Sequence, residues 1–212
     1  MNKLFFIIIL LPISVSVMAQ PIALAKEFYE NGQIKHVGSL ENNKKSGKWE
    51  FFYPSGTKEA IEHYENGELS GSAQYFDFDG NLIGKENWQA GNLEDSATYF
   101  YANGIIEKKG IYKAGMYDGL WVFYYPNAML KKSLTYYEGM PDGRWEYYSE
   151  NGVLVQKGQF AHGKETGEWE FYSKKGSLLY IGSYQNGERI GDWFIVNKRG
   201  KKKPLDYSQW DF

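Results

Sequence analysis

"GKWEFFYPSG", residues 47–56, decides the fold of this chain because the chain repeats it. Near-copies are "GLWVFYYPNA" at 119–128, "GRWEYYSENG" at 143–152 and "GEWEFYSKKG" at 167–176. Each copy gathers aromatic residues, which favour strands, and ends in Gly, Ser, Asn or Pro, which favour turns. The copies are 24 residues apart or a multiple of 24, and a fixed period of this length indicates a repeat architecture.

The same period aligns several columns of residues along the chain. A glycine column contains Gly47, Gly71, Gly119, Gly143, Gly167 and Gly191, with Asp95 in the remaining slot. Two residues later, a second column contains Trp49, Ala73, Ala97, Trp121, Trp145, Trp169 and Trp193. A third aromatic column contains Tyr64, Trp88, Tyr112, Tyr136, Phe160 and Tyr184, each followed three residues later by Gly. One period earlier, Phe28, Gly32, Ile34 and Leu40 fit these columns and predict a partial unit.

Each period holds two aromatic segments and two turns, so each unit is predicted to be a β-hairpin. "ENG" at 65–67 and "QNG" at 185–187 contain Asn-Gly, the strongest short hairpin signal. We therefore predict an all-β fold, an elongated single antiparallel meander of about seven 24-residue hairpin repeats, with roughly fourteen strands in all.

The columns resemble the MORN-repeat proteins, specifically the bacterial variant type with the pattern G-x-W-x-x-Y-x-x-x-G-x-L and a later Y-x-x-G. The resemblance covers residues 28–200, and Ala73 and Ala97 depart from it at the Trp position. It implies an elongated, twisted antiparallel sheet that acts as a scaffold or binding module. Some bacterial members carry the label "toxin-antitoxin system YwqK family antitoxin". Residues 1–19 of this chain are typical of a secretory signal, which fits poorly with neutralising a cytoplasmic toxin.

The predicted organisation has four parts. Residues 1–19 have Lys3 before an apolar run and end in small residues, which is typical of a cleaved signal peptide, with an uncleaved membrane anchor as the alternative. An N-terminal cap and partial repeat follow at 20–46, MORN-like repeats at 47–200, and a C-terminal cap or tail at 201–212. The signal predicts export to the periplasm, the outer surface or the medium.

The two faces of the predicted sheet differ. Because side chains alternate along a strand, Trp49 and Phe51 share one face and Phe52 points to the other. The Trp face is the predicted core, with Trp145 across from Gly158 and Trp169 across from Gly182, so that each indole covers bare backbone. The opposite face carries an aromatic ladder among polar neighbours, and it is the candidate binding face. The ladder consists of Phe52, Phe76, Phe100, Tyr124, Tyr148 and Tyr172.

Ala73 and Ala97 interrupt the Trp column, and two interpretations stay open. Trp88, on the strand between them, is expected to compensate for the lost volume. The alternative is a specialised pocket formed by the two alanines.

Charge is uneven along the chain. Acidic residues dominate 59–95, where only Lys85 opposes them, and they suggest a candidate acidic patch for a partner. The patch consists of Glu65, Glu68, Asp77, Asp79, Glu94 and Asp95. Basic residues gather at 198–203 and could contact a membrane surface, and both clusters could equally serve as solvated turns and edge protection. "PLDYSQWDF" at 204–212 is expected to fold back and cap the last hairpin.

Sequence motifs for catalysis or cofactors are absent. "DFDGN" at 77–81 mimics a calcium loop, but Trp88 stands where the loop needs Glu. The three His occupy different columns, and the chain has no Cys, so no metal-ligand spacing is present. No P-loop, dinucleotide or nucleophile-elbow motif occurs. We expect no enzyme activity, cofactor, metal or catalytic residue.

Function is therefore predicted at the level of binding. The formal net charge of −2 gives no general attraction for nucleic acid. The first hypothesis is a non-catalytic exported scaffold that binds a protein partner. The alternatives are recognition of envelope glycan or lipid head groups, and an antitoxin-like neutralising protein.

Overall fold

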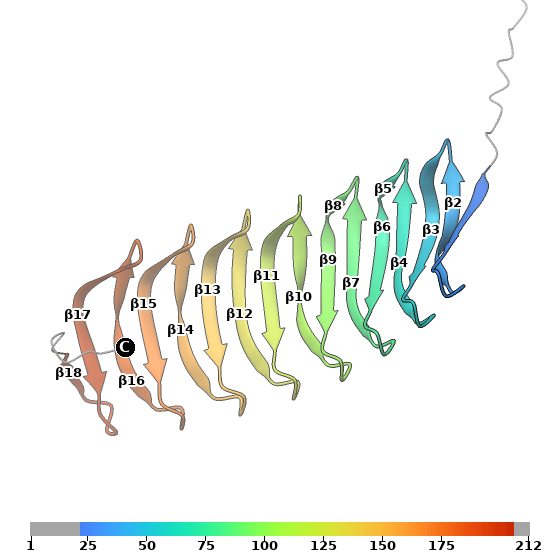
Figure 1. The fold of residues 1–212 in the computed structure, drawn as a ribbon. Coiled ribbons are helices and arrows are strands. Elements are labelled where there is room, and N and C mark those ends of the chain that lie inside the picture. The colour runs from blue at the N-terminus through green and yellow to red at the C-terminus, as the bar shows by residue number, and fades with distance from the viewer. Residues whose placement is uncertain (1–21, 206–212) are drawn as a thin grey trace, which may run out of the picture.

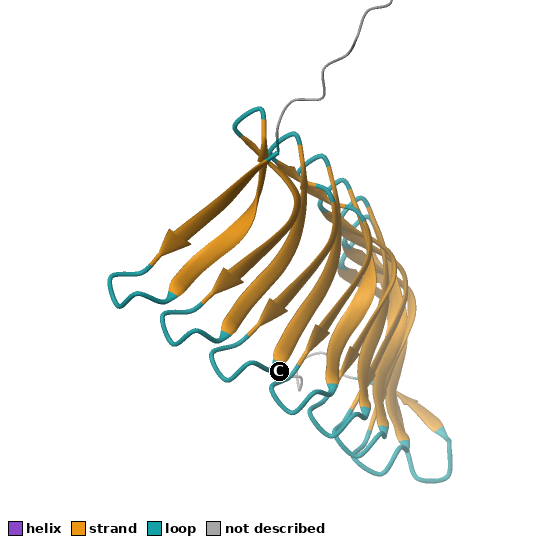
Figure 2. Ribbon diagram, turned by 90° about the vertical axis from the view of Figure 1, so that its right-hand side faces the viewer, coloured by secondary structure: helices purple, strands orange, loops and turns teal. Residues whose placement is uncertain are grey.

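The computed structural model of the protein describes residues 22–205, and they form one antiparallel β-sheet of 18 strands (Figure 1). None of these residues lies in a helix. The sheet is a single layer of curved strands that extends along the chain from β1 to β18 (Figure 2). The strands are β1 (Ala23–Phe28), β2 (Ile34–Glu41), β3 (Lys44–Phe52), β4 (Lys58–Glu65), β5 (Glu68–Leu69), β6 (Gly71–Phe76), β7 (Leu82–Gln89), β8 (Asn92–Leu93), β9 (Asp95–Phe100), β10 (Ile106–Lys113), β11 (Met116–Tyr124), β12 (Leu130–Tyr137), β13 (Met140–Tyr148), β14 (Leu154–Ala161), β15 (Lys164–Tyr172), β16 (Leu178–Gln185), β17 (Glu188–Val196) and β18 (Lys202–Pro204).

The predicted fold class, a meander of hairpin repeats, is confirmed. The count of strands is higher than the roughly fourteen predicted, for two reasons. In the second and third full units the strand that follows the Asn-Gly-type turn is interrupted, giving β5 and β6, and β8 and β9. Short strands β1 and β18 also extend the sheet at its two ends. The predicted signal peptide, and residues 206–212 of the predicted C-terminal cap, lie outside the described residues.

Two kinds of turn join the strands, as the sequence predicted. At one end of the sheet, Asn66 and Gly67 have φ of 53° and 89°, so both central residues of the turn are left-handed, as a tight hairpin turn requires. At the other end, a longer turn places Gly56 at φ 87°, and the Gly56 backbone N–H donates to the Tyr53 carbonyl at 2.8 Å.

The Gly-x-Trp motif forms a bulge in the ladder. Lys109 pairs with Val122 and Ile111 pairs with Asp118, so Gly110 faces three residues of β11. Because Gly119 has φ 61°, the chain can bulge there, and the Trp121 indole turns back over Gly110. A Cβ on Gly110 would lie 2.4 Å from the indole. The Gly–Trp pair is therefore a direct contact of a ring with bare backbone.

This contact corrects one prediction. Trp145 pairs with Gly158 and Trp169 with Gly182 in the ladder, as expected. However, the indole that covers Gly158 belongs to Trp169, and the indole that covers Gly182 belongs to Trp193. The bulge lies between each Trp and the preceding strand, so the ring reaches back across the bulge to that strand. The Trp face is the core, and Trp49, Trp121, Trp169 and Trp193 are almost completely buried.

Successive repeats are joined by hydrogen bonds at both ends of the strands. At one end, the Tyr53 hydroxyl donates to the Phe76 carbonyl at 2.8 Å, and equivalent bonds recur in other units. At the other end, the Gly139 N–H donates to the Tyr117 carbonyl at 2.9 Å, which again recurs. Each repeat is thus fixed on its neighbour, as in other repeat proteins in which contacts are between adjacent units.

Candidate functional site

The Trp face changes its chemistry in the second and third full units. The position covered by Trp is occupied along the chain by Gly38, Glu62, Glu86, Gly110, Leu134, Gly158 and Gly182. Glu62 and Glu86 are the carboxylates in this column, and they belong to the units in which Ala73 and Ala97 replace Trp. A Gly–Trp pair is thus exchanged for a Glu–Ala pair. Glu62 and Glu86 therefore lie on the face of the sheet on which the indoles lie in the other units.

Aromatic side chains hold both carboxylates. The Tyr64 hydroxyl donates to Glu62 at 2.5 Å, and the Tyr99 hydroxyl donates to Glu86 at 2.6 Å. The Trp88 indole N–H donates to the second oxygen of Glu86 at 3.1 Å. We name this half-buried region the acidic aromatic surface. It consists of Glu62, Tyr64, Tyr75, Glu86, Trp88 and Tyr99.

The tyrosines of this surface keep their protons to high pH. Burial raises the pKa of Tyr75 and of Tyr99 well above the usual range, and the neighbouring Glu86 carboxylate raises both further. Burial, followed by the Glu62 carboxylate, does the same for the pKa of Tyr64. A neutral tyrosine can donate its proton to a carboxylate, so these pairs are stable as hydrogen bonds at ordinary pH.

Lysines lie on aromatic rings at both borders of the surface. Lys45 Nζ is 4.5 Å from the centroid of the Tyr64 ring, and Lys108 Nζ is 4.4 Å from that of Tyr99. Such distances are typical of cation–π contacts. In the structure of residues 22–205, neither Glu62 nor Glu86 is within ion-pair distance of a cation. The surface therefore combines two carboxylates with rings of a type that already bind ammonium groups nearby.

That Trp88 compensates for the volume lost at the alanines stays a prediction, and the structure adds two carboxylates beside it. Glu62 and Glu86 occupy the equivalent position opposite the alanines, and Trp88 contributes by binding Glu86. As for the alternative, a specialised pocket formed by the two alanines, Ala73 and Ala97 are 1% and 2% exposed and line two separate hollows, of about 230 and 280 Å³, so neither hollow is formed by both. The sequence signal was present in the column that holds Gly at four positions, Glu at two and Leu at one, but this column faces the Trp column only through the bulge.

The structure divides the predicted acidic patch between the two ends of the strands. Glu65 and Glu68 form the last pair of the β4–β5 hairpin. Asp77 lies in the turn after β6, and nine residues of extended chain from Glu68 place it roughly 30 Å away. The members at the hairpin-tip end are Glu65, Glu68, Glu94 and Asp95, and those at the other end are Asp77 and Asp79.

Several of these carboxylates have structural roles. Asp77 Oδ1 accepts the backbone N–H groups of Asp79 and Asn81 at 3.0 and 2.8 Å, which fixes the turn that mimics a calcium loop. The hydrogen bond from the Asn81 side chain lowers the pKa of Asp77, and these backbone hydrogen bonds lower it further. Glu94 accepts the Ala114 N–H at 2.7 Å, and Asp95 takes the left-handed conformation, φ 65°, of the glycine that it replaces.

The aromatic ladder predicted as a binding face lies on the opposite face, near the longer turns. Its six rings, from Phe52 to Tyr172, are half-buried. Their cross-strand partners include aliphatic residues, as in the Phe76–Leu82 pair. Lys58 Nζ lies 6.0 Å from the Phe52 ring centroid. The ladder rings thus pack against neighbouring strands and stay partly exposed, and their role in binding remains a prediction.

Among residues 22–205, no group of three or more His, Asp or Glu side chains is arranged to hold a metal ion. The same residues contain no helix with the length and apolar character needed to cross a membrane.

The family model for the MORN repeat variant matches five segments of the chain, which together make up half of it. The segments are residues 23–42, 45–67, 96–114, 141–162 and 165–186. The chain belongs to the MORN repeat variant family. MORN repeats are generally repeats that interact with proteins or membranes. The matched segments leave out 68–95, which holds Ala73, Glu86 and Trp88, and 115–140, which holds Trp121, whereas Glu62, Tyr64 and Tyr99 lie in matched segments of this MORN protein.

Other comparisons add little. No curated protein matches the chain. One solved structure to which the MORN sheet is similar is the TcdB2-TccC3-Cdc42 complex, with 12% sequence identity and a TM-score of 0.18. The match covers 86% of this chain and 14% of the chain in that complex.

Proposed function

We propose that this MORN protein is a non-catalytic scaffold that binds a protein partner, and that the acidic aromatic surface receives a basic segment of that partner. The observation that carries the proposal is the exchange of Gly–Trp for Glu–Ala pairs. In the units that have Trp, the indoles bury apolar surface on the Trp face, whereas Glu62 and Glu86 bring two carboxylates onto the same face.

The chemistry of the surface fits Lys or Arg side chains. Carboxylates attract these cations, and aromatic faces add cation–π attraction. Lys45 and Lys108 already make such contacts at the borders of the surface. Because Tyr64, Tyr99 and Trp88 orient the carboxylates by hydrogen bonds, little side-chain freedom would be lost on binding.

A scaffold role without catalysis is supported by the way the carboxylates are used. Both are held by hydrogen bonds to aromatic donors, and no nucleophile with an adjacent base accompanies them in the motifs of the sequence. We further propose that the scaffold acts outside the cytoplasm, on the strength of the predicted signal peptide alone. Protease protection of the tagged full-length chain in whole cells would test that location.

The binding test uses peptides of defined sequence. Peptides would be selected from a random library on the immobilised full chain, and their Kd values measured by fluorescence anisotropy. We expect selected peptides to contain Lys or Arg, and Glu62→Gln combined with Glu86→Gln to weaken binding by about tenfold or more. Glu168→Gln combined with Glu188→Gln, at exposed positions outside the surface, is the matched control. Selected peptides without basic residues, or equal Kd values for both variants, would contradict the proposal.

A second candidate is recognition of an anionic glycan by the aromatic ladder on the opposite face. It is favoured by lysines that lie beside ladder rings, with Lys58 near Phe52 and Lys109 near Tyr124, each at 6.0 Å. A glycan array probed with the full chain would test it. Loss of glycan binding in the Phe76→Ser, Phe100→Ser and Tyr124→Ser variant would support the ladder, and equal binding would exclude it.

An antitoxin-like role would also act through protein binding. The predicted signal would separate this chain from a cytoplasmic toxin, so we place this role behind the scaffold. If the selected peptides match a segment of a basic toxin, that toxin would be co-expressed with this chain. Restored growth of the cells would indicate neutralisation, and binding without restored growth would indicate simple binding.

A further inference from the structure

A hollow recurs at equivalent positions of the repeats, on the face of the sheet opposite the indoles. One hollow, of about 230 Å³, lies over β6, β7 and β9, and another, of about 280 Å³, lies over β9, β10 and β11. The two hollows adjoin, because Ser96 and Thr98 line both. A third hollow, of about 220 Å³, is lined by Lys157 at the repeat position of Lys85. It lies in units that have Trp, so the hollow is a feature of the repeat and does not depend on the alanines.

Strand pairing places the side chains of the first two hollows on this face. Ala97 pairs with Gly110 on the Trp face. Because side chains alternate along a strand, the neighbouring pairs, Thr98 with Lys109 and Ser96 with Ile111, point to the opposite face. The repeat therefore sets the shape of each hollow, and its chemistry depends on the side chains at these alternate positions.

The first two hollows contain two lysines that no carboxylate neutralises. Lys85 and Lys109 both pair with Thr98, so a lysine lies on each side of that threonine. Within residues 22–205, neither lysine is in an ion pair. In the third hollow, Glu170 occupies the repeat position of Thr98, and its carboxylate is 3.0 Å from Lys157 Nζ. The same positions are thus neutralised in one repeat and positively charged in another.

The second hollow adds apolar side chains beside these lysines. Ile111 and Leu120 are 45% and 56% exposed, and Val122 pairs with Lys109. The other full units have a polar residue at the repeat position of Leu120, such as Ser96 in the unit before it. Exposed apolar side chains that gather in one place gain free energy when a partner covers them. The two hollows therefore form one strip, which has cationic and apolar parts. The strip consists of Lys85, Thr98, Lys109, Ile111, Leu120 and Val122.

We propose that this cationic apolar strip binds an acidic segment of a protein partner, with carboxylates beside Lys85 and Lys109 and an apolar side chain against Ile111 and Leu120. Charge complementarity identifies the occupant, because the strip lacks the carboxylate that Glu170 supplies in the third hollow. The inference does not depend on the acidic aromatic surface, which lies on the other face.

The spacing of the strands fits an extended segment that crosses them. The strip runs over adjacent strands from β7 through β9 and β10 to β11, and three strand intervals span about 14 Å. Alternate residues of an extended segment point to one side and are about 7 Å apart. A segment of the form Glu-x-Glu-x-Leu therefore places two carboxylates near the lysines and its Leu side chain at the apolar part.

The test compares the full chain with a variant in which the strip neutralises itself. Thr98→Glu places a carboxylate at the repeat position where Glu170 pairs with Lys157, so we expect it to pair with Lys85 or Lys109. Thr98→Gln is the matched neutral control, and Gln74 shows that the repeat position accepts this residue. Peptides from a random library would be selected on the immobilised full chain after removal of those that bind the Thr98→Glu variant.

We expect the selected peptides to contain Asp or Glu with a large apolar residue two positions later. Fluorescence anisotropy measures their Kd, which should rise about tenfold or more in Thr98→Glu and in Lys85→Gln combined with Lys109→Gln. Thr98→Gln should change the Kd by less than about twofold. Leu120→Ser, which introduces the residue of the preceding unit, should raise the Kd about threefold because it removes apolar surface.

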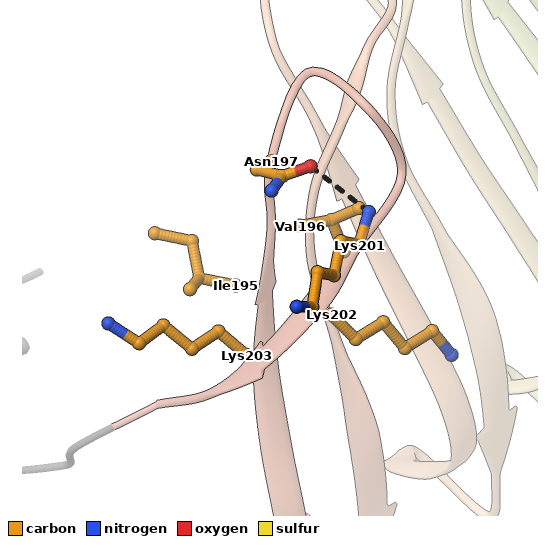
Figure 3. Close-up of a pocket in the computed structure, with 6 residues that line it drawn as sticks. All are labelled: Ile195, Val196, Asn197, Lys201, Lys202 and Lys203. Atoms are coloured by element: carbon orange, nitrogen blue, oxygen red, sulfur yellow. Dashed lines mark hydrogen bonds between the residues drawn. The ribbon is translucent and has the colours of Figure 1, made fainter.

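The matched control for the lysine variant lies at the last hairpin. There a separate hollow, of about 380 Å³, combines the exposed Ile195 side chain with Lys202 and Lys203 (Figure 3). It offers similar side chains without the cross-strand spacing of the strip, so Lys202→Gln combined with Lys203→Gln should leave the Kd unchanged. Equal losses in the two lysine variants would overturn the proposal. Equal Kd values for Thr98→Glu and Thr98→Gln, or selected peptides without acidic residues, would also overturn it.

Discussion

The units around Trp121 and the units around Ala73 and Ala97 solve the same packing problem in two ways. In the first region, the indole of Trp121 lies on Gly110 and is 0% exposed. In the second, Glu86 stands in the place of that glycine, and Ala97 in the place of the Trp. The strand pairing continues through both regions. The comparison shows that one backbone accepts either maximal apolar burial or a pair of oriented carboxylates on the same face.

The largest expected effect on the free energy of unfolding comes from a variant that breaks the Gly–Trp contact. In Gly110→Ala the new Cβ would lie 2.4 Å from the Trp121 indole, so the ring must move, and we expect a loss of about 3 kcal/mol in the free energy of unfolding. Gly84→Ala in the other region is the matched control, because its Cβ would be 3.5 Å from the Tyr75 ring. We expect a change within about 1 kcal/mol for the control. Urea denaturation measures both, and equal losses would contradict the comparison.

A second prediction converts one region into the other. Ala97→Trp alone would bring an indole against Glu86, and Glu86→Gly alone would remove the hydrogen bonds from Tyr99 and Trp88. The double variant rebuilds a Gly–Trp pair. We expect it to be more stable than the sum of the single variants by about 2 kcal/mol. A double-mutant cycle by urea denaturation measures this coupling, and additive losses would mean that the two columns do not pair.

Alkaline pH is expected to weaken the region that contains the carboxylates. Burial and the Glu86 carboxylate raise the pKa of Tyr75 and Tyr99, and burial raises that of Tyr112 to about 12. An unfolded tyrosine has a pKa of about 10, so above pH 10 the folded state binds more protons than the unfolded state. The free energy of unfolding must therefore fall as pH rises through this range.

Tyrosinate absorbance and urea denaturation between pH 9 and 12 follow this loss. Glu86→Gln removes the charge that contributes to the raised pKa of Tyr99, so the alkaline loss should be smaller in that variant. An unchanged alkaline profile would indicate that Glu86 does not interact with the tyrosines in solution.

The smallest expected effect concerns Asp95, which holds the left-handed position of the Gly column at φ 65°. Asp95→Gly relieves this conformation but gives the unfolded chain more freedom. We expect a net gain of less than about 1 kcal/mol, measured by thermal unfolding. Gly119→Asp in the Trp region, at φ 61°, is the reciprocal change and should lose a similar amount. A loss of several kcal/mol in either variant would show that the two bulges differ.

Most of the fold could be predicted from local pattern. The period, the Asn66-Gly67 turn and the pairing of Trp169 with Gly182 all follow from residues whose preferences are local or whose spacing is regular. The candidate site could be predicted from the sequence only in part. The predicted acidic patch followed charge along the chain, whereas strands carry neighbours in sequence to opposite ends of the sheet, as with Glu68 and Asp77.

The sequence by itself determined that this chain is a periodic β-meander with a Trp face, because strand and turn preferences repeat every 24 residues. Only the tertiary structure decided that the indoles of Trp49, Trp121, Trp169 and Trp193 each cover the glycine of the preceding strand, and that Glu86 meets Tyr99 thirteen residues away. The physical reason is the bulge at the Gly column. A left-handed residue locally shifts the pairing and changes the direction of the side chains after it. The 24-residue spacing of the columns carries no information about that change of direction.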